Sequence, residues 1–370
     1  MKVCHLSSVH PRFDTRIYLK QCRSLAAAGY DVSLVVADGK GPAVQDGVSI
    51  HDVGRVQGRI RRMRQSTKNI LAKAVALDAE VYHLHDPELI PVGLKLKQRG
   101  KKVIFDAHED LPKQLLSKPY LNRPALWLLA QIFSLYEARV CSRFDAIVTA
   151  TPAIRDKFLR MNPRTVDINN FPILGELATP TTIWNERKPH VCYVGGIASA
   201  RGIREVVRAM EHVRSAARLQ LVGNFSEPNV EAEVRTYPGW QRVDAHGFVG
   251  REAVKGILAE GMAGIVTFHS APNHLEAQPN KMFEYMSAGL PIIVSNFPLW
   301  QQVVERNQCG ISVDPSNPVE IGRAIDFLIQ NPKDAEAMGT RGYRAVLEQY
   351  NWPVEEVKLV SLYEQLLGGK

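Results

Sequence analysis

Short apolar runs alternate with helical patterns along this chain, and the alternation starts afresh after the middle. In the first half the expected strands are 2–6, 32–37, 81–84, 102–105 and 146–149. In the second half they are 191–194, 219–222, 263–268, 291–294 and 310–313. Strands that alternate with helices favour right-handed βαβ units and parallel sheets. The sequence therefore predicts an α/β protein built from two doubly wound sheets.

The length of the chain supports two domains, because 370 residues exceed the roughly 250–300 residues at which one hydrophobic core stops growing. Residues 169–188 separate the two series of strands, contain Pro172 and Pro180 and show little periodicity, so we expect an interdomain linker there. In doubly wound sheets, ligands bind beyond the carboxyl ends of the strands. Candidate site residues are therefore sought in the loops that follow strands.

The net charge of +8 suggests an anionic partner, and one segment carries most of the excess. Between positions 53 and 77 there are seven basic residues and no acidic residue. Ile60, Met63, Thr67 and Ala74 recur there at helical spacing, which predicts a helix whose apolar stripe packs on its own sheet. The cations of 55–73 then face solvent or an anionic membrane surface. Nucleic acid fits less well, because no aromatic residues interleave with the basic ones.

The cysteines and the lengths of the apolar runs argue against a disulfide-stabilised, zinc-binding, membrane-spanning or secreted protein. Five cysteines without a C-x-x-C pair argue against a disulfide framework and a structural zinc site. No apolar stretch approaches the ~20 residues of a membrane-spanning helix. The first residues lack the apolar core and cleavage site of a signal peptide. We therefore expect a cytoplasmic protein.

A glycine-rich loop joins the expected strand 191–194 to a helix expected over 204–213. Gly195 and Gly196 let the backbone approach an anion, and the helix start supplies unpaired N–H groups. Arg201 at the helix start is unfavourable for the helix dipole unless an anion binds there. The loop therefore favours a phosphate ligand, with a tight turn as the alternative. It matches neither G-x-G-x-x-G nor a P-loop.

Two carboxylates eight residues apart follow the strand that ends near Phe268. Pro279 marks the start of a helix, which places Glu284 in its first turns and Glu276 in the loop before it. Carboxylates in these positions can bind two separate hydroxyl-bearing groups of one ligand. The spacing leaves a simpler interpretation equally open, in which Glu284 only favours the positive helix end and Glu276 is solvated.

A histidine lies among three carboxylates just after the strand expected over 102–105, in the run Asp106-Ala107-His108-Glu109-Asp110. This combination suits acid–base chemistry or ligand binding. A metal site and a merely hydrogen-bonded loop histidine are the alternatives, and no second cluster in the sequence has to join these acids. The loop after the strand expected over 81–84 contains His85-Asp86-Pro87. There, Asp86 is expected to cap a helix that begins at Pro87.

The run from His10 to Arg16 joins the first strand to the first helix. It occupies the same topological place as the glycine loop of the second half. Asp14 or Thr15 can cap the helix, and Arg12 and Arg16 can meet an anionic ligand. No general motif requires that role.

Together these residues resemble the retaining glycosyltransferases of family 4, which have the GT-B fold. The strongest match is the E-x7-E signature, here Glu276 to Glu284. Gly195 and Arg201-Gly202 match the phosphate-binding Gly and Lys-Gly of the family. The runs that begin at His10, His85 and Asp106 look like those of a bacterial polysaccharide-biosynthesis branch. The resemblance covers essentially the whole chain.

The resemblance implies an arrangement of two Rossmann-like, doubly wound domains that face a central cleft. Residues 1–168 and a last helix, about 353–370, would form the acceptor-side domain. Residues 169–188 would be the linker, and 189–352 the nucleotide-sugar-binding domain.

The resemblance also implies transfer of a hexose from a nucleotide-sugar donor, with retained anomeric configuration, no cofactor and no metal. The implied donor-binding residues are Gly195, Gly196, Arg201, Asn280, Lys281 and Glu284. Glu284 would bind the ribose and Glu276 the sugar, while His108 matches a histidine near the transferred sugar. His108, Glu276 and Arg201 are the implied catalytic residues. The acceptor side would carry His10, Arg12, Asp14 and Arg16.

The acceptor implied by the resemblance and the basic segment is a saccharide or a lipid-linked saccharide, reached from the inner face of the plasma membrane. A GT-B nucleotide-sugar epimerase and a non-catalytic nucleotide-sugar-binding subunit are the alternatives. The sequence also departs from the family pattern. Gly196 replaces a second basic residue, Gln278-Pro279 replaces a Phe-Gly pair, and the His10 run replaces a glycine-rich loop. Donors based on uridine and on guanosine both stay open.

Overall fold

The computed structural model describes residues 1–116, 122–177 and 184–368. Residues 178–183 of the expected linker, 369–370 of the expected last helix and the Arg59 side chain lie outside the described part. The chain divides into two compact units, which are described separately below. Unit 1 comprises Met1–Asn170 and Pro353–Lys370, and unit 2 comprises Phe171–Trp352.

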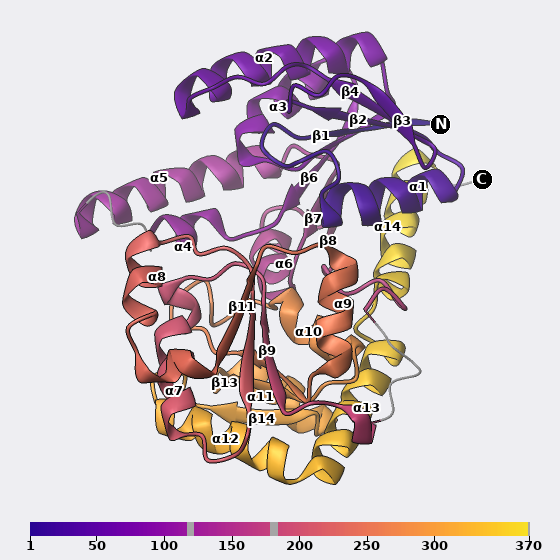
Figure 1. Ribbon diagram of the computed structural model, residues 1–370. Helices are drawn as coiled ribbons and strands as arrows, with labels where there is room; N and C mark the ends of the chain where they lie inside the picture. The colour runs from indigo at the N-terminus through magenta and orange to yellow at the C-terminus, as the bar shows by residue number, and fades with distance from the viewer. Residues whose placement is uncertain (117–121, 178–183, 369–370) are drawn as a thin grey trace. The chain divides into compact units, whose positions relative to one another are not determined.

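Unit 1 is built on an eight-stranded sheet of order β3-β4-β2-β1-β5-β6-β7-β8 (Figure 1). All neighbouring strands are parallel except β3 and β4. The strands are β1 Lys2–Leu6, β2 Asp31–Val36, β3 Ala43–Gln45, β4 Val48–Asp52, β5 Val81–Leu84, β6 Lys102–Ala107, β7 Ala146–Thr149 and β8 Thr165–Asp167. The chain adds β2 and β4 on one side of β1 and β5 to β8 on the other, so the direction of winding switches between β1 and β5.

Helices connect and cover this sheet. They are η1 Thr15–Cys22, α1 Arg23–Ala27, α2 Arg59–Leu77, η2 Pro87–Leu89, α3 Ile90–Gln98, α4 Leu111–Leu116, α5 Arg123–Cys141, α6 Pro152–Leu159 and the final α14 Trp352–Leu367. η1 has wide π-type turns, and Asp14 caps it by accepting hydrogen bonds from the N–H groups of Arg16 and Ile17. Asp14 thus takes the capping role expected for it or Thr15.

Unit 2 has a six-stranded, fully parallel sheet of order β11-β10-β9-β12-β13-β14. Its strands are β9 His190–Val194, β10 Arg218–Val222, β11 Val243–Gly247, β12 Ala263–Val266, β13 Ile292–Ser295 and β14 Gly310–Val313. Its helices are η3 Trp184–Glu186, η4 Ser199–Arg201, α7 Ile203–His212, α8 Pro228–Val234, η5 Pro238–Arg242, α9 Arg251–Glu260, α10 Asn280–Ser287, α11 Pro298–Asn307, α12 Pro318–Gln330 and α13 Pro332–Glu348. The winding switches between β9 and β12.

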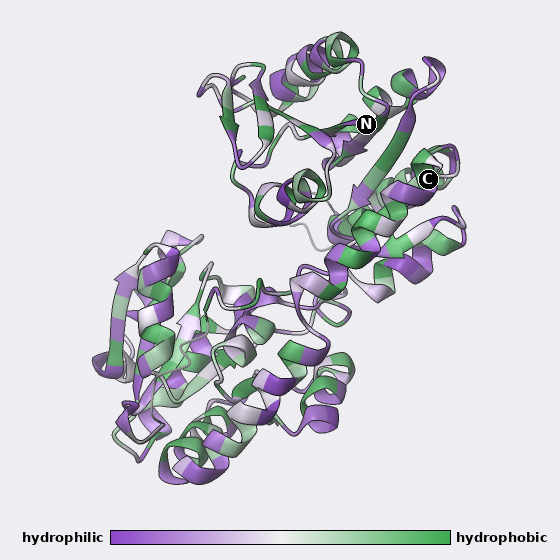
Figure 2. Ribbon diagram, turned by 90° about the vertical axis from the view of Figure 1, so that its right-hand side faces the viewer, coloured by the Kyte–Doolittle hydropathy of each residue, from purple (hydrophilic) through white to green (hydrophobic). Residues whose placement is uncertain are grey.

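Side-chain alternation along the strands builds a core on each face of the second sheet. Val194 and Val266 join one buried cluster with α10, whereas Tyr193 and Ile265 join another with α7. Hydrophilic and hydrophobic residues accordingly alternate along the surrounding helices (Figure 2). The α/β class with two parallel sheets is therefore confirmed.

Each strand expected from an apolar run is present, but the edge strands β3, β8 and β11 and the interior strand β4 were not foreseen. β3 and β11 are mostly exposed or half-buried, so their sequences lack the apolar run that marks a buried strand. The expected linker also differs from what the structure shows. Phe171 and Leu177, which fall within the expected linker, are buried in the core of unit 2.

The basic segment forms α2, but its apolar stripe is only partly core, in contrast to the expectation. Ile70 and Ala74 are buried in unit 1, whereas Ile60 and Met63 are 70% and 45% exposed. Among the described residues, none of the helices combines the length and apolarity needed to cross a membrane.

Candidate active site

The glycine loop of unit 2 follows β9 at the switch point, the place where doubly wound sheets bind ligands. Gly195 has a φ of +104°, a conformation that side chains rarely adopt. Gly202 ends the short helix η4, and a Cβ atom there would lie 2.0 Å from the Thr267 carbonyl oxygen. The loop therefore needs glycine at both places to pass between β9 and α7.

Two cations occupy the space that the loop glycines leave. A Cβ atom on Gly195 would lie 2.8 Å from Lys281 Cε, and one on Gly196 would lie 2.7 Å from Arg201 Nη1. The Arg201 guanidinium donates to the Gly196 carbonyl oxygen at 3.0 Å. Lys281 Nζ lies 4.2 Å from the centre of the Tyr193 ring. We call Gly195, Gly196, Arg201 and Lys281 the two-cation cradle.

The amino group of Lys281 is buried and has no hydrogen-bond partner among the described residues. Burial and, to a smaller extent, the charge of Arg201 lower the pKa of Lys281 to about 7, although the Glu284 carboxylate acts in the opposite direction. A buried ammonium without a counter-ion beside a guanidinium is unfavourable. An anion bound in the cradle would remove that penalty.

Helix α10 carries the second carboxylate of the E-x7-E pair. The helix begins at Asn280, directly after Pro279, where the sequence predicted a helix start. Its N-cap residue, Pro279, makes no side-chain capping hydrogen bond. Glu284 lies in the first turns and accepts a hydrogen bond from Arg251 Nη1 at 3.0 Å. Glu276 is exposed in the turn before the helix. The loop and helix positions expected for the two carboxylates are therefore correct.

Arg251 and Glu176 were not foreseen as site residues. Arg251 opens α9 and donates through Nε to Glu176 at 2.8 Å, so it bridges Glu176 and Glu284. Burial opposes the charge of Arg251, but the two carboxylates outweigh it and raise its pKa. A cation at a helix start is the signal that drew attention to Arg201, and the same signal was present at Arg251.

In unit 1, Asp106 at the end of β6 is the centre of a buried polar cluster. Its carboxylate accepts from Arg16 Nε at 3.0 Å, from Arg16 Nη2 at 2.8 Å and from Gln21 Nε2 at 2.8 Å. Burial opposes its ionisation, but Arg16 and His108 outweigh burial and hold the pKa of Asp106 well below its usual range. His108 Nε2 lies 3.2 Å from Asp106 Oδ2, and its side chain is 21% exposed.

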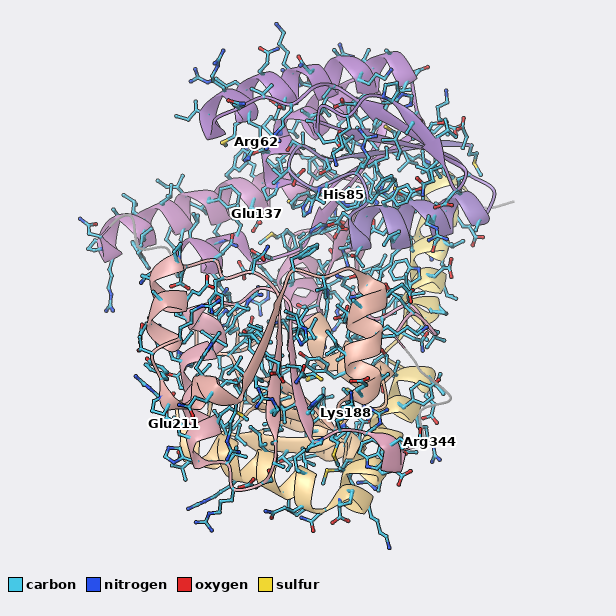
Figure 3. All side chains as sticks on the ribbon, in the orientation of Figure 1. Arg62, His85, Glu137, Lys188, Glu211 and Arg344 are labelled. Carbon is cyan, nitrogen blue, oxygen red and sulfur yellow. The ribbon has the colours of Figure 1, made fainter. Side chains whose placement is uncertain are left out.

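Three further histidines extend this cluster: His5 in β1, His83 in β5 and His85 directly after β5 (His85 is labelled in Figure 3). His5 Nδ1 lies 2.8 Å from His85 Nε2, and the hydroxyl group of Tyr363 from α14 lies 2.9 Å from His83 Nδ1. Burial lowers the pKa of His85 to about 3 and holds those of His5 and His83 well below their usual value. These rings are therefore neutral near neutral pH.

Side chains in this cluster could also hold an ion. Within the described residues, the groups are His5 with His83 and His85, and His85 with Asp106 and His108. In the second group, Arg16 already neutralises the Asp106 carboxylate, which disfavours a metal cation there.

The other residues expected on the acceptor side have internal partners. Arg12 pairs with Asp38 through two contacts of 2.7 Å and is buried. His10 lies 3.5 Å from Asp14 and 3.4 Å from Asp86, and its ring centre lies 5.2 Å from that of His108. His10 and His108 are therefore brought together, whereas Arg12 and Arg16 do not present open cations to an anionic ligand.

Asp86 occupies the capping position before Pro87, but its side chain does not cap the helix. Its carboxylate instead accepts from Ser7 Oγ at 3.0 Å and from the Ser8 N–H group at 2.6 Å. The expectation of a side-chain cap was wrong, because the loop after β1 supplies closer donors.

Both halves of the chain match known sequence families. Residues 15–172 match the glycosyl transferase 4-like domain, and residues 179–345 match glycosyl transferases group 1. An uncharacterised glycosyltransferase of Methanocaldococcus jannaschii is 22% identical over 301 residues, which cover 77% of this chain and 75% of that protein. The chain is a GT4-type glycosyltransferase.

Two further comparisons bear on this glycosyltransferase. Sucrose-phosphate synthase from Thermosynechococcus elongatus has a similar structure, with a TM-score of 0.79 and 19% identity over 99% of both chains, in agreement with a GT-B fold. A GDP-mannose:cellobiosyl-diphosphopolyprenol alpha-mannosyltransferase of Komagataeibacter xylinus is 29% identical over 109 residues. That match covers 29% of this chain and 28% of the mannosyltransferase.

Proposed function

We propose that this glycosyltransferase moves a hexose from a nucleoside diphosphate sugar to a saccharide, with retention of anomeric configuration and without a metal ion. The observation that carries the proposal is the two-cation cradle, in which glycines at the end of β9 make room for Arg201 and Lys281. Lys281 reaches the loop from α10 and takes the place of the basic residue that Gly196 replaces. The two cations and the uncapped start of α10 suit a diphosphate.

In this proposal the cradle acts mainly on the leaving group. As the bond from the anomeric carbon to the diphosphate oxygen breaks, negative charge grows on that oxygen, where Arg201 and Lys281 stabilise it. The acceptor hydroxyl attacks the same face of the sugar, and its proton passes to an oxygen of the departing diphosphate. No protein nucleophile takes part, so the role of Glu276 is to bind sugar hydroxyls.

The remaining residues position the substrates. Glu284, held by Arg251, binds the ribose hydroxyls, and His108, held by Asp106, lies beside the transferred sugar. His10, next to His108, contacts the acceptor. Arg12, Asp14 and Arg16 act through the internal contacts that shape this loop.

We further propose that the acceptor is a lipid-linked saccharide of a polysaccharide pathway and that the enzyme works on the inner face of the plasma membrane. The matching mannosyltransferase of Komagataeibacter xylinus has a diphosphopolyprenol acceptor in its name, which supports a lipid-linked acceptor. The cations of 55–73 also support an anionic surface, and Arg61, Arg64 and Lys68 are exposed on α2.

A thermal-shift panel with UDP, GDP, ADP and their common sugar conjugates tests the donor site. A ligand at ~100 times its dissociation constant stabilises the protein by ~2.7 kcal/mol, which is measurable. We expect one nucleotide to shift the melting temperature, Arg201→Ala to abolish the shift and Arg208→Ala, an exposed arginine on α7, to retain it. An equal shift in the Arg201→Ala protein would contradict the cradle.

Activity assays then separate transfer from the alternatives. With the selected donor, release of nucleotide that depends on a saccharide acceptor supports transfer. Conversion of the donor without acceptor or nucleotide release would indicate an epimerase. Donor binding without either reaction would indicate a non-catalytic binding subunit. Activity that survives exhaustive chelation with EDTA is expected, and its loss would contradict metal-independent transfer.

A further inference from the structure

Helix α5 exposes an unusual number of large apolar side chains. Those with at least 39% of their surface exposed are Trp127, Leu128, Leu129, Ile132, Leu135 and Tyr136. Single exposed apolar residues are ordinary, but a set of this size on one helix usually marks a surface that contacts a membrane or another protein.

The apolar side chains of α5 lie mainly opposite its buried side. At about 100° per residue, Leu128, Ile132 and Leu135 share one stripe. Leu126 and Ala130, which are buried in unit 1, lie on the other side of the helix. Both sides of the helix are therefore apolar, but only the side with Leu126 and Ala130 is buried by packing within unit 1. We call the exposed stripe, with Trp127, Leu129 and Tyr136, the α5 face.

The α5 face continues onto α2 through a surface hollow. Ile60, Met63 and Arg64 of α2, Pro87, Glu88 and Pro91, and Tyr136 of α5 line this hollow. The exposed Ile60 and Met63, expected from sequence to be core, therefore belong to the same apolar surface as Tyr136. Figure 3 labels Arg62 on α2 and Glu137 on α5, the two helices that carry this surface.

The charges around this surface are almost all positive. α2 carries six basic residues and no acidic residue, and α5 adds Arg123 and Arg139. The acidic residue of α5, Glu137, is buried and lies 2.6 Å from Lys157. Arg62 pairs with Glu88, whereas Arg61 and Arg64 are exposed at the edge of the apolar surface.

We propose that the α5 face lies in the plane of an anionic lipid bilayer, with the cations of α2 against the headgroups. Exposed apolar side chains of α5 can enter the acyl boundary of a bilayer, while the neighbouring arginines of α2 meet anionic headgroups. Two copies of the same face would bring their cations together, which disfavours self-association through it. The proposal rests on the membrane location proposed above, and it assigns the surface that enters the bilayer to α5 rather than to the basic segment.

Trp127 provides a direct probe of the proposal. It is 58% exposed, whereas Trp184, Trp300 and Trp352 are buried and Trp240 is partly buried. The full-length protein would be mixed with vesicles of phosphatidylcholine alone or with phosphatidylglycerol, made with and without brominated acyl chains. We expect the vesicles with phosphatidylglycerol to sediment the protein and the brominated chains to quench its fluorescence, with no quenching in Trp127→Phe.

Matched double variants test which surface is responsible. Leu128→Ser/Leu135→Ser removes two exposed residues of the α5 face, and we expect at least a tenfold loss of vesicle binding. Val44→Ser/Val357→Ser removes two residues of unit 1 that are 78% and 69% exposed outside that face, and should bind as wild type. A nucleotide thermal shift is measured for every variant, so loss of the donor site is distinguishable from loss of docking.

Three outcomes would overturn the proposal. They are absence of sedimentation with anionic vesicles, equal quenching in Trp127→Phe, and unchanged binding by the Leu128→Ser/Leu135→Ser protein. Concentration-dependent dimerisation that this double variant abolishes, without vesicle binding by the wild type, would assign the face to a second copy of the chain instead.

Discussion

The polar cluster around Asp106 in unit 1 and the two-cation cradle in unit 2 both lie at the switch points of their sheets, but they treat charge in opposite ways. In unit 1, Arg16 and Asp106 form a buried, bidentate pair. In unit 2, Lys281 and Arg201 lie beside each other, and Lys281 has no hydrogen-bond partner among the described residues. The first arrangement is complete within the fold, whereas the second needs an anion from outside.

This difference assigns separate tasks to the two regions. A buried pair with additional donors fixes the direction of side chains, here His85 and His108 around Asp106. The buried ammonium of Lys281 beside the half-exposed guanidinium of Arg201 raises the free energy of the empty site, and a bound diphosphate would remove that cost. Removal of a cation should therefore destabilise the fold in unit 1 and weaken ligand binding in unit 2.

The largest expected effect is on folding, in Arg16→Ala. Removing one partner of a buried ion pair leaves the Asp106 carboxylate uncompensated, which costs about 3–5 kcal/mol. Urea denaturation followed by circular dichroism measures the free energy of unfolding. Arg155→Ala is the control, because Arg155 is 35% exposed in its pairs with Asp156 and Asp167 and should cost about 0–1 kcal/mol. Equal losses in the two variants would remove the distinction between the buried cluster and a surface pair.

Lys281→Met should give the opposite pattern. The variant removes a buried amine without a hydrogen-bond partner among the described residues, so the free energy of unfolding should stay the same or rise. Nucleotide binding should weaken by about 1.5–3 kcal/mol, or roughly 10–150-fold, because a charged hydrogen bond to the diphosphate is lost. Titration calorimetry and urea denaturation measure the two quantities. A destabilised protein with unchanged nucleotide affinity would show that Lys281 is structural.

These contrasting roles were only partly visible in the sequence. The cation at a helix start drew attention to Arg201, because local spacing and the helix dipole are properties of neighbouring residues. The pairing of Arg16 with Asp106 joins residues 90 positions apart, and no local pattern shows that they meet. The sequence alone therefore allowed Arg12 and Arg16 to meet an anionic ligand, a role that no motif required.

The fold shows the same limit. Most buried strands followed from their apolar runs, whereas the edge strands β3, β8 and β11 and the interior strand β4 did not. Buried and half-buried residues alternate in β4, so it has no apolar run, and exposed edge strands need none. The apolar residues of α5 gave no indication of a surface role. Periodicity shows that a helix has apolar sides, but only packing shows which of them meets the core.

The two carboxylates of the E-x7-E pair provide a smaller test within unit 2. Glu284→Ala should weaken nucleotide binding about tenfold, the low end for a charged hydrogen bond, because Arg251 already shares the carboxylate. Glu276→Ala should leave affinity for the nucleotide nearly unchanged and reduce transfer instead. Calorimetry with the nucleotide and with its sugar conjugate separates the two effects. Equal losses of nucleotide affinity would remove the ribose assignment of Glu284.

The smallest effect, when expressed per pH unit, is a pH dependence that should belong to Lys281. Its pKa is lowered from 10.5 to about 7 in the folded protein, so between these values the unfolded chain binds more protons. The free energy of unfolding should therefore gain a contribution that grows as pH rises through this window, and Lys281→Met should lack it. Nucleotide affinity should change in the opposite direction and fall by less than tenfold per pH unit above about 7, because the complex requires the protonated amine.

The control for this pH dependence is Lys281→Arg. Arginine keeps its charge at all these pH values, so the nucleotide affinity of this variant should vary less with pH. If the nucleotide affinity of the wild type depended on pH as little as that of Lys281→Arg, the amine would already be charged in the empty site. The contrast with the neutralised cluster of unit 1 would then rest on geometry alone.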